Sequence, residues 1–239
     1  MPALLNLGPS VLNRRLVFGV ESDFDEFVTG DKFTDTSADT GAAVANTDAA
    51  GGVVTLTTGA TDNNECYLLS TKELFLIALD KPILASCRLK YSEANTDDAN
   101  VAFGLMNAVA ANSILDDGAG LQASYSGAAF YKVDGGLNWK VEASIATTRY
   151  GATELTATNS LDKVAKVAAS SAYQWLDIEI VPFSSTQAKV NFFIDEVLVH
   201  SITMTYTSAT EMMVFVGVKA GGANSEVVSV DYLGAWQKR

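Results

Sequence analysis

The sequence predicts an all-β protein, folded as a two-sheet antiparallel β-sandwich. Three observations lead to this prediction. Residues 173–204 contain three consecutive segments in which apolar and polar side chains alternate. Further strand candidates recur at intervals of about 8–12 residues, and clusters of Asn, Asp and Gly separate them. No stretch has a convincing helical period, and only residues 70–79 and 161–169 leave room for one short helix.

The alternation in residues 173–204 is the clearest local signal. Successive side chains of a strand point to opposite faces, so the apolar residues at every second position share one face. These residues are Leu176, Ile178 and Ile180 in the first segment and Val190, Phe192 and Ile194 in the second. Asp195-Glu196 then predicts a tight corner into the third segment. Three antiparallel strands with one apolar face need a second sheet to cover it.

The other strand candidates lie on both sides of this central stretch. They are the strand around Val54 and Leu56, then residues 66–70, 82–91, 100–106, 120–125, 128–133, 137–145, 212–219 and 227–236. Residues 147–171 are rich in Thr, Ala and Ser and predict either an elaborated loop or edge strands. No sequence repeat is evident.

The charge distribution divides the chain into an N-terminal arm, residues 1–20, and a sandwich domain, residues 21–239. The arm holds Arg14 and Arg15 and no acidic residue, whereas residues 21–65 hold ten acidic residues against the single base Lys32. Such a contrast indicates a segment that docks on another surface. Residues 1–20 would form either an ordered N-terminal strand preceded by a leader, or an arm that lies along a neighbouring subunit. The net charge of −12 argues against nucleic acid as a partner, because a phosphate backbone would be repelled.

The two cysteines, Cys66 and Cys87, predict buried thiols, with a disulfide between neighbouring strands as the alternative. No stretch approaches 18 apolar residues, so we expect no membrane span. We also expect no secretory signal, because Asn6, Pro9 and the run at residues 13–15 interrupt the apolar N-terminal segment.

Several segments together resemble one family of folds. They are Trp175–Ile180, Val190–Val199, Val216–Lys219 and Val230–Leu233, with Phe103–Leu105 and Asp117–Gly120 earlier in the chain. This pattern resembles the concanavalin A-like (laminin-G-like) jelly roll over about residues 24–237. The acidic domain with a separate arm is also similar in style to virion structural proteins of tailed bacteriophages, such as head decoration and tail-associated proteins.

The residues give little support to catalysis. A retaining glycosidase on this fold needs paired carboxylates, usually as Glu-x-Asp-x-Glu. Asp177 and Glu179 have the right spacing, but Trp175 stands where the nucleophile should be. His200 is the only histidine, and neither a Gly-x-Ser-x-Gly elbow nor a phosphate-binding loop is present. We therefore expect no catalytic residue and no cofactor.

A metal site is also not expected. One histidine and two cysteines do not make a zinc site. The acidic turns at residues 97–98 and 116–118 contain calcium-type ligands, but their spacing matches no calcium loop and turn chemistry explains them.

Non-catalytic binding remains, with five candidate contact residues on the outward face of paired strands. Trp175, Asp177, Glu179, Asn191 and Phe193 would combine an aromatic platform with hydrogen-bonding groups there. Together with the resemblance, this predicts a structural virion protein, a capsid decoration or cement protein that docks through Arg14, Arg15 and its sheet face. Its partners would be the major capsid protein or another virion protein and further copies of itself, in a particle assembled in the host cytoplasm. The alternative is a carbohydrate-binding module of a tail or host-adhesion device.

Overall fold

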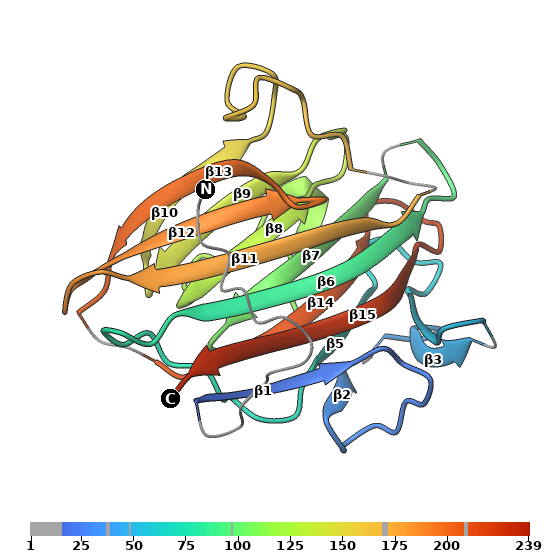
Figure 1. The fold of residues 1–239 in the computed structure, drawn as a ribbon. Helices are drawn as coiled ribbons and strands as arrows, with labels where there is room; N and C mark the ends of the chain where they lie inside the picture. The colour runs from blue at the N-terminus through green and yellow to red at the C-terminus, as the bar shows by residue number, and fades with distance from the viewer. Residues whose placement is uncertain (1–15, 37–38, 48, 97, 169–171, 208–209) are drawn as a thin grey trace.

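The computed structural model describes residues 16–239 except 37–38, 48, 97, 169–171 and 208–209. Its strands form two antiparallel sheets, A and B, which pack face to face (Figure 1). The only helical segment in this part of the chain is a short 3₁₀ turn, Asp116–Gly118, and no described helix is long and apolar enough to span a membrane. The predicted two-sheet β-sandwich is confirmed.

The chain crosses several times between the two sheets. Sheet A contains, in spatial order, β13 (Val197–Thr205), β12 (Gln187–Ile194), β11 (Gln174–Pro182), β6 (Ile83–Ser92), β15 (Val227–Lys238), β4 (Val53–Thr57) and β3 (Ala43–Thr47), with β1 (Val17–Ser22) also paired to β15. Sheet B contains β10 (Thr148–Glu154), β9 (Lys140–Ile145), β8 (Gly127–Lys132), β7 (Ala99–Met106), β14 (Met213–Ala220), β5 (Glu65–Ser70) and β2 (Phe33–Thr36).

The central stretch forms the predicted meander β11–β12–β13. In the observed register Ile178 lies opposite Phe192, and both side chains are fully buried between the sheets. The corner between β12 and β13 is made by Asp195 and Glu196, whose φ angles of 48° and 67° are both left-handed. A two-residue hairpin loop with two positive φ angles has the hand that matches the twist of its flanking strands.

One predicted strand is wrong. Residues 120–125 were expected to form a strand, but they belong to the connection between β7 and β8 and make only an isolated bridge between Ile114 and Leu121. Residues 17–20, the end of the N-terminal segment, lie in β1, which pairs with the end of β15; an ordered N-terminal strand was one of the two alternatives for this segment. Residues 147–171 contain both predicted alternatives, because β10 is an edge strand of sheet B and a loop follows it.

The connection between β7 and β8 adds a third layer to the sandwich. Ile114, Leu121 and Tyr125 of this connection form a second hydrophobic cluster with side chains on the outward face of sheet B, among them Tyr67 and Phe215. Apolar residues of a strand therefore point outward where this connection covers them. The alternation in β5 and β14 is lost for that reason, and both strands are buried along their whole length.

Both cysteines are buried free thiols, as predicted. Cys66 lies in β5 of sheet B and Cys87 in β6 of sheet A, so they are not neighbours in one sheet. Burial raises the pKa of the Cys66 thiol to about 12. A thiol with so high a pKa carries almost no thiolate and is a poor nucleophile.

Candidate binding face on sheet A

The outward face of sheet A carries an aromatic strip formed by Trp175, Tyr232 and Trp236. Trp175 of β11 and Tyr232 of β15 both lie opposite Arg88 of β6. Trp175, Arg88 and Tyr232 therefore form one row across the sheet. The ring centroids of Trp175 and Tyr232 are 5.4 Å apart, and those of Tyr232 and Trp236 are 6.2 Å apart with nearly parallel planes. Trp175 is 38% exposed. Tyr232 and Trp236 are half-buried. Mutually packed rings of this kind form a rigid apolar platform with polar edges.

Two glycines allow the rings to lie against the sheet. A Cβ atom at Gly19 would stand 2.5 Å from the Trp236 ring, and one at Gly234 would stand 3.0 Å from both Trp236 and the Tyr232 hydroxyl. Any larger residue would therefore push the rings away from the sheet. Tyr232, Gly234 and Trp236 occupy every second position of β15, so they lie on one face of the sheet.

Charged groups border the aromatic strip. The Arg88 guanidinium forms an ion pair with Asp231, with Nη1 and Oδ2 separated by 2.6 Å, and lies 4.6 Å from the Tyr173 ring centroid. The Tyr232 hydroxyl donates a hydrogen bond of 3.0 Å to Glu21. Burial, together with the Glu21 carboxylate, raises the pKa of Tyr232 well above its ordinary value, so this hydroxyl stays protonated. The strip thus has hydrogen-bond donors and acceptors at its edges.

Only part of the predicted contact set is accessible. Trp175 is exposed and Asp177 is half-buried, with a hydrogen bond from the Ser86 hydroxyl, and burial raises the pKa of Asp177. Glu179, Asn191 and Phe193 do lie on the outward face, but they are 6%, 9% and 1% exposed. These three residues therefore share the predicted face but are buried on it, and the role of the five residues as contacts stays a prediction. Arg14 and Arg15 lie outside the described residues.

The structure gives the two acidic strand residues structural partners. The Glu179 carboxylate accepts a hydrogen bond of 2.9 Å from the Asn191 amide, whose oxygen accepts one of 2.7 Å from Ser201. His200 is half-buried, burial lowers its pKa, and its Nδ1 atom has no hydrogen-bond partner among the described residues. Asp177 and Glu179 thus each accept a hydrogen bond from a neighbouring strand.

The acidic turns also have other partners. Asp116 forms an ion pair with Lys219, and the backbone N–H of Asp117 donates to the Asn63 side chain. Within the described part of the chain, no group of three or more His, Cys, Asp or Glu side chains is arranged to bind a metal ion. Of the predicted turn at residues 97–98, residue 97 lies outside the described residues.

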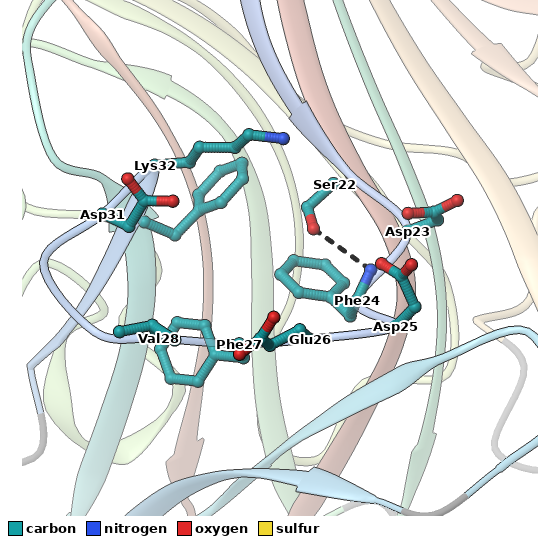
Figure 2. A pocket seen from close by; sticks show the side chains of 10 residues that line it. Ser22, Asp23, Phe24, Asp25, Glu26, Phe27, Val28, Asp31 and Lys32 are labelled. Atoms are coloured by element: carbon teal, nitrogen blue, oxygen red, sulfur yellow. Dashed lines mark hydrogen bonds between the residues drawn. The ribbon is translucent and has the colours of Figure 1, made fainter.

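A small surface cavity of about 220 Å³ lies between the end of β1 and the start of β2 (Figure 2). Its walls contain the rings of Phe24 and Phe33, both almost fully buried, together with the acidic residues Asp23, Asp25, Glu26 and Asp31. Phe24 has a left-handed φ of 53°, and its N–H donates to the Ser22 hydroxyl. Ligand pockets usually enclose roughly 300–1,000 Å³. This cavity is smaller than that and is less suited to an extended ligand than the aromatic strip.

The sequence analysis identified Trp175 but missed Tyr232, Trp236 and Arg88. These residues come together only through the pairing of β11, β6 and β15, whose positions in the chain are far apart. One local signal was available in β15. Its residues Tyr232, Gly234 and Trp236 place a glycine between two aromatic residues at every second position, and this pattern predicts that an aromatic ring lies on the backbone at the glycine. The pairing partners of that strand were not predictable in the same way.

Comparisons with known proteins support the fold. No family model matches the sequence, and no curated protein matches it. The structure is similar to the carbohydrate recognition domain of Emp47p, with 10% identity, a TM-score of 0.56 and coverage of 91% of this chain and 94% of that one. It is similar to a legume lectin-like domain from Entamoeba histolytica, with 10% identity, a TM-score of 0.56 and coverage of 85% and 89%.

The same fold also occurs in an enzyme. An endo-β-1,4-glucuronan lyase from the fungus Trichoderma reesei is similar at 10% identity, with a TM-score of 0.54 and coverage of 91% of this chain and 94% of that one. At such low identities these similarities establish a concanavalin A-like, legume-lectin-type β-sandwich and nothing about the site.

Proposed function

We propose that this protein is a non-catalytic carbohydrate-binding module and that the aromatic strip on sheet A is its binding face. The observation that carries the proposal is the packing of Trp175, Tyr232 and Trp236 into one platform that is open to solvent at Trp175. The C–H face of a pyranose ring packs on such a platform, and its hydroxyl groups hydrogen-bond to polar groups at the edge. The ion pair of Arg88 with Asp231 and the Glu21 carboxylate are suitable partners for those hydroxyl groups.

A panel of immobilised oligosaccharides tests this proposal, because the saccharide is unidentified. We expect saturable binding of at least one saccharide by the intact protein and its loss in a Trp175→Ala variant. Phe183→Ala is a matched control, because Phe183 is an exposed aromatic residue just beyond the other end of β11. Binding that survives Trp175→Ala and fails in Phe183→Ala would locate the site elsewhere.

The absence of catalysis is part of the same proposal. The Glu179 carboxylate is engaged by Asn191, Asp177 is bonded to Ser86, and Trp175 takes the position of a glycosidase nucleophile. Incubation with polyglucuronate and with neutral polysaccharides, followed by chromatography of the products, tests it. Chain cleavage by the intact protein that is lost in Asp177→Asn would show an enzyme instead.

A second proposal, that the protein is a structural component of a tailed-phage particle, has one supporting feature. The acidic residues of the 21–65 block that line the surface cavity, Asp23, Asp25, Glu26 and Asp31, offer a negatively charged docking surface to a basic partner. Capsid proteins and further copies of this chain are the partners that the proposal requires. Mass spectrometry of purified particles from the native source tests it, and absence of the protein from such particles would refute it.

A further inference from the structure

A lysine without an acidic partner lies at one end of the aromatic strip. Lys90 is two residues from Arg88 on β6, so it shares the outward face of sheet A and lies one row further along the strand. Its Nζ lies 4.9 Å from the centroid of the Tyr173 ring, just before the start of β11. Within the described part of the chain, no carboxylate forms an ion pair with Lys90. A cation held on an aromatic ring in this way has a fixed place and an unused charge.

The neighbouring cation is neutralised within the protein. The register of β15 against β6 shifts between Val230 and Tyr232, so Asp231 is the extra residue of a β-bulge. A bulge re-aims a side chain, and here it brings the Asp231 carboxylate to 2.6 Å from the Arg88 guanidinium. The side chains of Arg88 and Asp231 are 36% and 20% exposed, so solvent reaches the pair. Because this pair carries no net charge, Lys90 supplies the uncompensated charge at this end of the strip.

The acidic residues of the same face lie further along β6. Asp177 is opposite Ser86, and Glu21 of β1 lies in the same row through β15. Ser86 and Lys90 are four residues apart, or about 13 Å at roughly 3.3 Å per residue. The Debye length at physiological salt is about 8 Å. The positive charge of Lys90 is therefore felt locally, although the whole chain has a net charge of −12.

We propose that the aromatic strip selects anionic saccharides, with Lys90 as the partner of their carboxylate or sulfate group. This inference rests on the proposed function. Trp175 lies opposite Arg88, so it is one row, or about 6.6 Å along the strand, from the row of Lys90. One saccharide residue bridges that separation, so a ring stacked on Trp175 places the anionic group of the next residue over Lys90. The same arrangement orients the ligand, because its hydroxyl groups at the opposite end face Glu21 and not a cation.

An immobilised panel tests this inference on the intact full chain and three variants. The panel carries oligosaccharides of glucose, galactose and mannose in a neutral form, with a uronate carboxylate at C6, and with a sulfate group at C6. We expect at least one anionic form to bind about fivefold tighter than its neutral counterpart, which is the effect of one solvent-exposed ion pair. The arms with uronate and with sulfate show which group Lys90 accepts. The preference should shrink as the salt concentration rises.

The variants separate the charge from the platform. Lys90→Met should remove the preference and leave the binding of the neutral form unchanged. Lys189→Met is the matched control, because it removes the same charge from an exposed position of β12 on the same face, opposite Val181, and it should keep the preference. Trp175→Ala should lose both neutral and anionic ligands.

Three results would overturn the inference. If the neutral and anionic forms bind the intact protein equally, or if Lys90→Met keeps the preference, Lys90 does not select the ligand, whereas the aromatic strip still stands as the binding face. If Trp175→Ala binds the anionic form as tightly as the intact protein does, the anion is held without the platform. If no member of the panel binds the intact protein, the proposed function fails and this inference fails with it.

Discussion

Replacing Lys219 by methionine should destabilise the protein by removing the cation of a buried network. Lys219 is fully buried on the outward face of sheet B, under the connection between β7 and β8. Its Nζ lies 2.7 Å from Asn112 Oδ1, 3.1 Å from the Ile114 carbonyl and 3.4 Å from Glu65 Oε2, and it also pairs with Asp116. All of these partners except Glu65 belong to the β7–β8 connection, so the network holds that connection to the sheet.

The magnitude follows from what the substitution leaves behind. Glu65 would keep its hydrogen bonds from the Tyr67 hydroxyl and the Asn112 N–H, at 2.6 Å and 2.7 Å, but its buried charge would have no cation. Removing one partner of a buried ion pair costs about 3–5 kcal/mol. For a chain of this size each kcal/mol lowers Tm by about 2–4 °C, so Tm should fall by at least about 6 °C.

Urea unfolding followed by tryptophan fluorescence measures this loss. The surface pair of Lys166 with Asp162 provides the matched control, and Lys166→Met should cost under about 1 kcal/mol. Adding Glu65→Gln to Lys219→Met should recover part of the loss, because the second change removes the unpaired charge. A loss below about 1 kcal/mol for Lys219→Met would refute the reasoning, since it would show that water reaches the network.

Three further predictions concern other buried groups. Burial raises the pKa of Glu226 to about 7, so its neutral form is favoured in the folded protein. The free energy of unfolding should therefore fall as the pH rises from about 4.5 through 7. Thermal unfolding at several pH values measures this, and the dependence of Tm on pH should be flatter for Glu226→Gln than for the intact protein. An unchanged profile would show that Glu226 is solvated. Gly217→Ala should lower the free energy of unfolding by about 1–3 kcal/mol, because its Cβ would lie 2.4 Å from the Tyr67 ring; denaturant titration measures this, and a neutral result would mean that Tyr67 moves freely. Neither Cys66 nor Cys87 should react with a thiol reagent at pH 8 until the protein unfolds, and rapid labelling of the folded protein would contradict the burial of both.

The sequence predicted the sandwich because most core strands show their period directly. The meander of β11, β12 and β13 was found with its corner at Asp195-Glu196, since alternation and turn chemistry are both local properties. Residues 120–125 were mistaken for a strand because Leu121 and Tyr125 are apolar for a different reason, namely their contact with the outward face of sheet B. A third layer cannot be distinguished from a strand by period alone.

The candidate site was predictable only in part. Trp175 was identified because an aromatic residue on the polar side of a strand is conspicuous. Tyr232 and Arg88 join it through strand pairings that connect residues 88, 175 and 232, and no local pattern contains that information. The outward face of Phe193 and Glu179 was predicted from their alternation with core residues, but alternation specifies a face and not how exposed each side chain is on it.

The most direct test of the central claim is a calorimetric titration of the saccharide identified by the panel into the intact protein, Trp175→Ala and Phe183→Ala. We expect Trp175→Ala to weaken binding by at least about tenfold, which corresponds to about 1.4 kcal/mol. Phe183→Ala should bind as the intact protein does. Equal affinity in all three proteins would contradict the assignment of the aromatic strip on sheet A as the binding face.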